Sequence, residues 1–436
     1  MVKSGKIQVL DSLCGCGKTY AMIEYMRQHK DKVWMFVTPL LSEAGDSEHI
    51  GRLRQQAPEM DFKPPKATSS GSKLDSLKEL LHAKENITTT HNLFLMMDEE
   101  CIEAIKAYGY NIVVDEVIEK VSVFTEVKQS FVQDVIKLTT GGFFIKERED
   151  GLLEWVGDEL AAYKVVIDYC KRKELYLHKG KILIKRYSSK AYEVAEGVYI
   201  LTYKFKASPM RMWLDACGLH WQYLGIPLRE TNQERKQKLK KLITIEPKRQ
   251  PAICLHHDYK RPFTSTWYNN LSGELKVSVL QEMKKCATQL YYTWTKRRAR
   301  EGKQDTAPRI MYTAFKAYKD EVVGKGCIRE NFLDNRSSAF VSKNARATNE
   351  FSDKEYLIHW VDVYPHTVMS DYLSHICQGE TLDQDEYALS ELIQWIFRSK
   401  IREGSPICIY IASDRMRDLF EAWLDTPEKA VHRVEI

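Results

Sequence analysis

The sequence lacks several features that would fix its class at once. It has no run of eighteen apolar residues, which a membrane-spanning helix would need, and its first ten residues contain no apolar segment of the kind found in secretion signals. Its ten cysteines form no CxxC pair and no cluster with histidine, so neither a zinc site nor a disulfide framework is indicated. These absences predict a cytoplasmic protein with reduced thiols and no membrane partner.

The composition also shows no extreme that would indicate a disordered or fibrous chain. Hydrophobic residues make up 44% of the sequence and charged residues 29%, which is typical of globular proteins. The net charge of +5 is compatible with a phosphate-rich partner without requiring one. No internal repeat and no low-complexity segment is present. Because 436 residues exceed the size at which one hydrophobic core stops growing, we expect two domains.

Short apolar runs alternate with amphipathic stretches along most of the chain, a pattern typical of parallel strands joined by helices. We therefore expect an α/β fold with two domains, residues 1–228 and 251–436, joined by a polar and basic linker at 229–250. An irregular pattern at about 121–196 predicts an insertion in the first domain. Strands are predicted at 7–10, 33–38, 87–89, 112–114, 198–202, 309–313, 339–342, 356–361 and 407–411, and a long helix at 385–402.

A glycine-rich segment between a predicted strand and a predicted helix is the most specific feature. Residues 12–19 read Ser-Leu-Cys-Gly-Cys-Gly-Lys-Thr, which in this context is typical of a phosphate-binding P-loop. In such a loop the backbone N–H groups and the helix N-terminus surround the phosphates, the lysine reaches the β and γ phosphates, and the hydroxyl binds Mg²⁺. The predicted ATP contacts are Cys14, Gly15, Cys16, Gly17, Lys18, Thr19 and Tyr20.

The P-loop match departs from the standard pattern at one position, because Ser12 stands where the first glycine is usual. A plain glycine-rich turn with an exposed lysine is one alternative. A redox or metal site at Cys14 and Cys16 is another, but no second ligand pair lies nearby in the sequence.

Two adjacent carboxylates follow the apolar run at 112–114. Because ligands of a parallel sheet sit at the carboxyl ends of its strands, Asp115 and Glu116 are candidate site residues. Asp115 would hold Mg²⁺ through its hydration shell, and Glu116 would orient and deprotonate an attacking water. An ordinary strand end is the alternative, but the distance from the P-loop leaves room for two intervening strand–helix units.

With these two motifs in place, the sequence resembles superfamily 2 helicases, and in particular the DEAD/DEAH-box-like helicases of bacteriophages. The P-loop corresponds to motif I of that family, and Asp115-Glu116 resembles motif II, with Val117 and Ile118 in place of its last two residues. The resemblance covers nearly the whole chain. It implies two RecA-like P-loop domains, each a largely parallel sheet flanked by helices, with ATP and Mg²⁺ bound between them.

Further segments resemble the family's nucleic-acid-binding motifs. Residues 37–40 and 89–91 resemble motifs Ia and Ib, residues 201–205 resemble motif III without its usual Ser-Ala-Thr form, and residues 342–349 resemble motif V. Strand-end threonines are suitable phosphate contacts, although a plain structural role is the alternative for each segment. The strand contacts implied by the resemblance are Thr38, Pro39, Thr90, His91, Arg346, Thr348 and Asn349.

The last long predicted helix carries Gln394, Arg398 and Arg402, which resemble motif VI. The family places arginines of this motif against the γ-phosphate from across the interdomain cleft, where they stabilise charge in the transition state. Because these three residues are spaced by four, one helical face would carry them all. The family's second arginine falls at Ile401 here, so Arg402 departs from the pattern. A solvated helix face is the alternative.

A basic stretch at 296–300 follows the aromatic residues Tyr291, Tyr292 and Trp294. This mixture suits phosphate neutralisation and base stacking. A solvated helix end is the alternative.

The whole pattern predicts an ATP-dependent nucleic-acid helicase or translocase, with Lys18, Glu116, Gln394, Arg398 and Arg402 as the catalytic set and Thr19 and Asp115 as magnesium ligands. The resemblance implies action on DNA rather than RNA in phage replication or recombination, with replication proteins as partners and the host cytoplasm as location. Two alternatives come from other classes. One is an oligomeric P-loop motor such as a packaging ATPase, and the other is a non-catalytic nucleic-acid-binding protein on a helicase fold.

Overall fold

The first sheet has the N-terminal strand near its centre. The computed structural model describes residues 7–39, 53, 56–67, 71–142, 144–248, 261–303, 306–322, 340–342, 350–428 and 433–435. Seven of the described strands form this sheet in the order β16-β11-β1-β10-β4-β2-β3, and every neighbouring pair is parallel. The strands are β1 (Ile7–Asp11), β2 (Trp34–Thr38), β3 (Ile87–Thr90), β4 (Asn111–Asp115), β10 (Gly197–Thr202), β11 (Trp221–Gly225) and β16 (Val434–Glu435).

Helices cover both faces of this sheet. The helix α1 (Lys18–Gln28) packs on one face, where Met22 and Ile23 join the apolar cluster of Trp34 and Phe36. The opposite face is covered by α3 (Lys73–His82), α4 (His91–Leu95), α5 (Glu99–Tyr108), α8 (Lys190–Val194) and α9 (Pro209–Ala216). Because both faces are buried, the central strands read as nearly continuous apolar runs.

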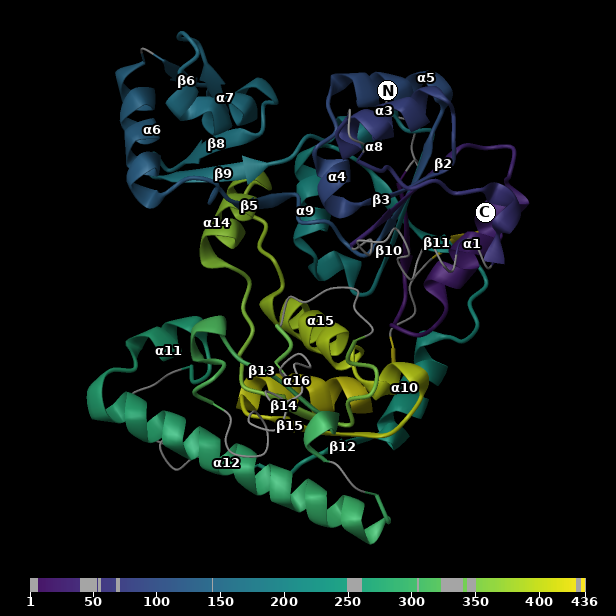
Figure 1. Ribbon diagram of the computed structural model, residues 1–436, viewed down its shortest axis with the longest axis vertical. Helices are drawn as coiled ribbons and strands as arrows, with labels where there is room; N and C mark the ends of the chain where they lie inside the picture. Colours follow the sequence, from purple (N-terminus) through teal and green to yellow (C-terminus); the bar gives the residue numbers. More distant parts are fainter. Residues whose placement is uncertain are drawn as a thin grey trace.

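The predicted insertion forms a separate lobe beside the first sheet (Figure 1). Its own apolar cluster includes Val135, Leu153 and Val166. The lobe contains an antiparallel sheet of β5 (Val121–Val123), β9 (Ile182–Arg186) and β8 (Leu175–His178), a hairpin of β6 (Ile145–Glu147) and β7 (Leu153–Trp155), and the helices α6 (Gln129–Gly141) and α7 (Lys164–Lys171). After β9 the chain returns to the first sheet through α8.

A second parallel sheet lies in the C-terminal half, in the order β12-β15-β14-β13. Its strands are β12 (Ile243–Ile245), β13 (Ile310–Thr313), β14 (Tyr356–His359) and β15 (Ile407–Ile411). One face packs against α10 (Asn232–Leu242), α15 (Gln384–Ile396) and α16 (Asp414–Asp425), and the other against α11 (Ser265–Asn270) and α12 (Gly273–Arg300). The expected α/β fold with two parallel sheets flanked by helices is confirmed. No helix in the described part of the chain is both long and apolar enough to cross a membrane.

The range 229–250, which the sequence predicts as a linker, contains regular structure. Thr231 and Glu234 form a capping box that starts α10, and β12 pairs with β15 of the second sheet. The basic residues that suggested a linker are helical, and Leu239 among them packs into the apolar cluster of the second sheet. The second structural unit therefore begins at α10.

Two segments of the C-terminal half return to the first half (Figure 1). The strand β16 pairs with β11, and α14 (Thr367–Ile376) packs on α9 and β5. In α14, Asp371 lies 2.7 Å from His178 Nε2 and forms an ion pair with Lys179 (2.6 Å), and both partners belong to the lobe. The lobe is therefore held by both halves of the chain.

A buried lysine marks the junction between the acidic pair and the lobe. Lys120 directly precedes β5 and is 3% exposed. Its ammonium nitrogen lies over the rings of Phe94, Tyr192 and Trp213, at 4.9, 4.7 and 5.1 Å from their centroids. Burial lowers the pKa of this amine to about 7, and the carboxylate of Glu174 only partly opposes the shift.

This depressed pKa predicts a pH-dependent stability. Between pH about 7 and the ordinary value of 10.5, the unfolded chain binds a proton at Lys120 and the folded protein does not, so raising the pH stabilises the fold. The unfolding free energy of the wild type should rise relative to Lys120→Met by on the order of 3 kcal/mol between pH 7 and 10. Urea unfolding across this range measures it, with exposed Lys106→Met as the control. Parallel profiles for the wild type and Lys120→Met would contradict the assignment.

Candidate functional site

The glycine-rich loop leaves the C-terminal end of β1 and leads directly into α1. Gly15 and Gly17 have φ values of 86° and 91°, a left-handed region that favours glycine. Lys18 Nζ donates to the carbonyl oxygens of Ser12 (2.6 Å) and Leu13 (3.2 Å), so the amine lies over the loop. The first N–H groups of α1 have no carbonyl partner within the helix. The loop therefore offers backbone donors and one cation to an anion.

The rear of this loop is held by the first residue of α10 and the chain that precedes this helix. Asn232 Oδ1 accepts hydrogen bonds from Ser12 Oγ (2.6 Å) and from the backbone N–H of Leu13 (2.8 Å), and the N–H of Arg229 donates to the carbonyl of Cys16 (3.2 Å). Ser12 thus uses its hydroxyl where the standard pattern has a glycine. Sequence reasoning missed Asn232, because 220 positions separate it from Ser12 and the only local signal is the departure at Ser12 itself.

The outer side of the loop carries an exposed cation–π contact. Tyr20, in the first turn of α1, is 36% exposed, and the Arg229 guanidinium lies 4.1 Å above its ring. Thr19 is half-buried in the same turn. The predicted contacts from Cys14 to Tyr20 are therefore contiguous around one loop and one helix start.

The acidic pair lies at the end of β4, two strands from β1. Asp115 is buried, and its backbone oxygen lies 2.9 Å from His91 Nε2. Glu116 has a φ of 64°, a left-handed conformation that is strained for a residue with a Cβ. Its Oε2 is buried and has no hydrogen-bond partner among the described residues. Both features cost stability, and such costs concentrate at functional sites.

The arginine segment differs from the predicted continuous helix. The helix α15 ends at Ile396, and a separate 3₁₀ turn, η7 (Lys400–Glu403), follows. Ser399 caps this turn by accepting a hydrogen bond from the N–H of Ile401 (3.4 Å), which offers the backbone an alternative to a longer helix. The predicted helical face with Gln394, Arg398 and Arg402 is therefore wrong. Gln394 instead donates to Ser390 Oγ (3.2 Å) on α15.

The thiol of Cys14 shows which charges surround the P-loop. Burial raises its pKa above the ordinary value, the carboxylate of Glu116 adds to this, and three cations oppose it. The charges that act on this thiol come from both halves of the chain and are Lys18, Glu116, Arg402 and Arg398. The structure thus brings the P-loop, the acidic pair and residues 398–403, here called the arginine turn, within electrostatic reach of one atom.

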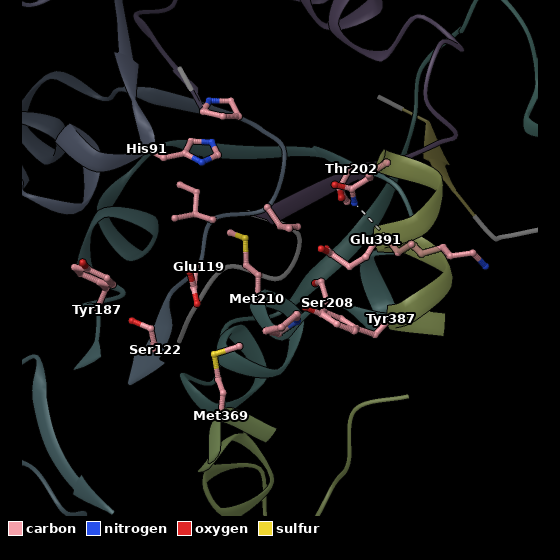
Figure 2. A pocket seen from close by; sticks show the side chains of 18 of the residues that line it. His91, Glu119, Ser122, Tyr187, Thr202, Ser208, Met210, Met369, Tyr387 and Glu391 are labelled. Carbon is pink, nitrogen blue, oxygen red and sulfur yellow. Dashed lines mark hydrogen bonds between the residues drawn. The ribbon is translucent and has the colours of Figure 1, made fainter. Parts of the chain in front are cut away.

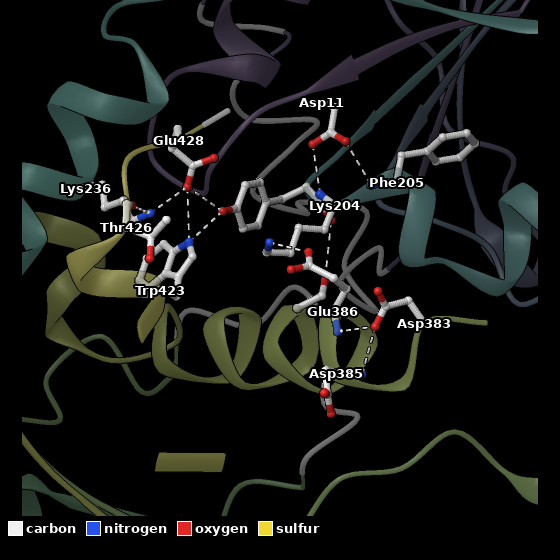
Figure 3. A network of polar contacts seen from close by, with 12 residues as sticks. Asp11, Lys204, Phe205, Lys236, Asp383, Asp385, Glu386, Trp423, Thr426 and Glu428 are labelled. Atoms are coloured by element: carbon white, nitrogen blue, oxygen red, sulfur yellow. Dashed lines mark hydrogen bonds and ion pairs between the residues drawn. The ribbon is translucent and has the colours of Figure 1, made fainter. Parts of the chain in front are cut away.

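A polar network after β10 connects the two halves (Figure 3). Asp11, at the end of β1, accepts hydrogen bonds from the N–H groups of Lys204 and Phe205, both at 2.8 Å. Tyr203 donates to Glu428 (3.0 Å) and accepts from Trp423 (2.9 Å). Lys204 forms an ion pair with Glu386 of α15. The segment that resembles motif III therefore contacts both the N-terminal strand and the second half.

A cavity of about 470 Å³ adjoins the same strand ends, between the first sheet, the lobe, α14 and α15 (Figure 2). His91 lines it from the start of α4, Thr202 from the end of β10, Tyr187 from the lobe and Met369 from α14. Its charged lining is mixed and includes Lys185, Lys204, Glu119 and Glu391.

The predicted nucleic-acid contacts occupy different environments. Pro39 and His91 line the cavity, whereas Thr38 is fully buried at the end of β2. The Thr90 hydroxyl caps α4 by accepting from the N–H of Leu93 (3.1 Å). Arg346, Thr348 and Asn349 lie outside the described residues.

The basic stretch of α12 likewise contains both buried and exposed residues. Arg298 is buried against Glu355, and Arg297 pairs with Glu246 (3.0 Å), whereas Lys296 and Arg300 are exposed. Only part of this stretch is therefore available to a partner.

The oxygen donors Thr19 and Asp115 fit a magnesium ion. Mg²⁺ takes one or two carboxylates from a protein, keeps several waters and completes its shell with phosphate oxygens. Among the described residues, no group of three or more His, Cys, Asp or Glu side chains gathers as a metal site. The donor set suits an ion that phosphate and water hold in large part.

Comparison with known proteins gives relatives for both sequence and structure. The family model described as the YonV C-terminal Rossmann-like domain matches residues 237–424. The SPbeta prophage-derived uncharacterized protein YonV of Bacillus subtilis (strain 168) is 28% identical over 442 residues, covering 96% of this chain and 99% of that protein.

Two solved structures illustrate the structural likeness. The structure of S. tokodaii Xpd4 gives a TM-score of 0.49 at 13% identity, covering 97% of this chain and 95% of that chain. Mss116p bound to ssRNA and AMP-PNP gives a TM-score of 0.39 at 9% identity, covering 100% of this chain and 71% of that chain.

The strain at Glu116 predicts that its removal stabilises the fold. Glu116→Gly removes both the left-handed strain and the buried carboxylate, so we expect the unfolding free energy to rise by about 1 kcal/mol. Chemical denaturation measures the change. Lys84→Gly, at an exposed position with a φ of 55°, controls for the backbone effect alone. A less stable Glu116→Gly protein would show that the side chain holds the turn together.

Proposed function

We propose that the chain is an ATP-dependent helicase or translocase of the superfamily 2 type, with two RecA-like domains, predicted at residues 1–228 and 251–436, of which the second also includes α10 and β12. The observation that carries this proposal is that Arg235 packs against Gly15 of the P-loop and donates to the carbonyl oxygens of Ile401 (3.5 Å) and Arg402 (3.4 Å), so that the arginine turn lies beside the loop. A site that draws its loop from one sheet and its arginines from another responds to the separation of the two sheets. Such a site couples nucleotide turnover to domain movement.

Each residue has a distinct role in this proposal. Lys18 and the loop N–H groups bind the phosphates, and Glu116 accepts a proton from the attacking water. Arg398 and Arg402 neutralise the charge that develops on the transferred phosphoryl group, and Gln394 couples this region to the cavity. Magnesium, held by Thr19 and Asp115, would supply further neutralisation of the phosphate oxygens.

The proposed substrate is a single nucleic-acid strand, DNA rather than RNA. Pro39 and His91 on the cavity wall, and Thr38 and Thr90 at neighbouring strand ends, provide the contacts from the first half, with Arg346, Thr348 and Asn349 proposed from the second. The prophage origin in the name of the Bacillus relative supports a role in phage replication or recombination in the host cytoplasm, beside replication proteins.

The arginine turn distinguishes this proposal from an oligomeric P-loop motor. Such a motor takes its arginine from a neighbouring subunit, whereas the turn that carries Arg402 is linked through Arg235 to the loop of its own chain. Turnover that appears only in a ring, judged by size-exclusion chromatography with ATP, would favour the motor. A non-catalytic binding protein would show no turnover at all.

The proposal predicts the kinetics of three variants. ATP turnover should rise with single-stranded DNA in the wild type and disappear in Lys18→Ala. Glu116→Gln should lower kcat by about 10²-fold or more, because it removes the general base, and Arg398→Ala by about 10³-fold. Phosphate release with and without DNA or RNA measures this. Unchanged turnover in Lys18→Ala would rule out the P-loop as the site of hydrolysis.

A further inference from the structure

The first turn of α10, together with the residues that precede it, packs against the P-loop over residues 229–235, here called the α10 latch. Ser12 is fully buried, and its N–H donates to the carbonyl of Thr202 (2.9 Å), which fixes its position on the sheet. Its hydroxyl then reaches Asn232 Oδ1 at 2.6 Å, and the same oxygen takes the N–H of Leu13 at 2.8 Å. One amide oxygen therefore sets the path of the chain as it enters the P-loop.

A second latch residue touches the loop and the arginine turn at once. Arg235 is 8% exposed, and a Cβ on Gly15 would lie 2.6 Å from its Nη2. The same Nη2 donates to the carbonyl oxygens of Ile401 (3.5 Å) and Arg402 (3.4 Å). Arg235 also pairs with Glu230 (3.3 Å), while its Nε is buried without a hydrogen-bond partner among the described residues.

The latch belongs to the second sheet through the chain itself. The helix α10 runs directly into β12, which pairs with β15 from Ile243 to Ile245. A displacement of the second sheet therefore moves the latch. Because the latch contacts both the P-loop and the arginine turn, the displacement reaches both.

We propose that Asn232 and Arg235 are positioning residues of the nucleotide site, Asn232 for the P-loop backbone and Arg235 for the turn that carries Arg402. This inference rests on the proposed ATPase function and deepens it. Neither residue needs to contact the nucleotide. Asn232 keeps the loop N–H groups in the phosphate-binding arrangement, and Arg235 keeps the arginines at a fixed distance from that loop.

The two substitutions should separate binding from chemistry. Asn232→Ala removes an acceptor of two hydrogen bonds, so KM for ATP and the Kd of fluorescent ADP with Mg²⁺ should rise about tenfold. Arg235→Ala should leave this Kd within about twofold and lower kcat about tenfold, because the loop is intact and the arginine turn is displaced. Substitution of a residue with only a structural role would not change the Kd without kcat, or kcat without the Kd.

Gln233→Ala is the matched control. Gln233 is an amide on the same turn, and its side chain accepts the N–H of Glu428 (2.9 Å) instead of a group of the P-loop. Its loss should lower the melting temperature without changing the Kd or kcat. A double variant Ser12→Ala/Asn232→Ala should bind ADP no more weakly than Asn232→Ala alone, because both changes remove the same hydrogen bond.

The measurements distinguish failure of the latch from failure of the ATPase proposal. If Lys18→Ala abolishes turnover while Asn232→Ala and Arg235→Ala behave like Gln233→Ala, the latch is overturned and the ATPase stands. Additive effects of Ser12→Ala and Asn232→Ala would overturn the pairing of these two residues. If the wild type binds no nucleotide, both proposals fall together.

Discussion

The P-loop is packed between the two sheets, and the rest of the site depends on this placement. Leu13 and Cys16 belong to the loop of the first sheet, yet their side chains are fully buried in the apolar cluster of the second. Burial of a leucine side chain stabilises a fold by on the order of 2 kcal/mol. The loop is therefore not a free surface turn, because any separation of the sheets exposes part of it to water.

Hydrogen bonds surround this apolar contact. They differ from it because water can replace their partners when the two halves separate. The carboxylate of Glu428 takes hydrogen bonds from Tyr203 (3.0 Å), Trp423 (3.1 Å) and Lys236 (3.2 Å), all at the same oxygen. Hydrogen bonds of this kind exchange with water at small net cost when they open, whereas an apolar contact does not. The interface thus has an apolar centre and a polar rim. This arrangement favours a few defined positions of the two halves.

Much of the fold could be predicted from local sequence, because buried parallel strands are nearly continuous apolar runs. The strands around the site were recognisable in this way, and Asp115 and Thr202 fall at their ends as expected. The strand β11 was missed, since Gln222 and half-buried aromatic residues interrupt its pattern, and β12 was hidden in a basic stretch. The short β16 has only two residues and no local signal.

The site itself was less accessible to sequence reasoning, because its geometry depends on contacts between distant segments. The P-loop and the acidic pair have local patterns, but the break after Ile396 depends on the capping of η7 by Ser399. Asn232 and Arg235 carry no motif, and their contacts with Ser12 and Gly15 become visible only when the second sheet is in place. Side chains that position a motif from a distant segment cannot be recognised from residue spacing.

The return of the last strand to the first sheet has a consequence for how the halves can move. The second half is joined to the first through the chain after β11 at one end and through β16, which pairs with β11, at the other. Both of its chain ends are therefore anchored at the same border of the first sheet (Figure 1). Rotation about this border leaves both chain ends in place, but it has to move α14 against α9 and β5, so the contacts of α14 limit how far the two halves can turn.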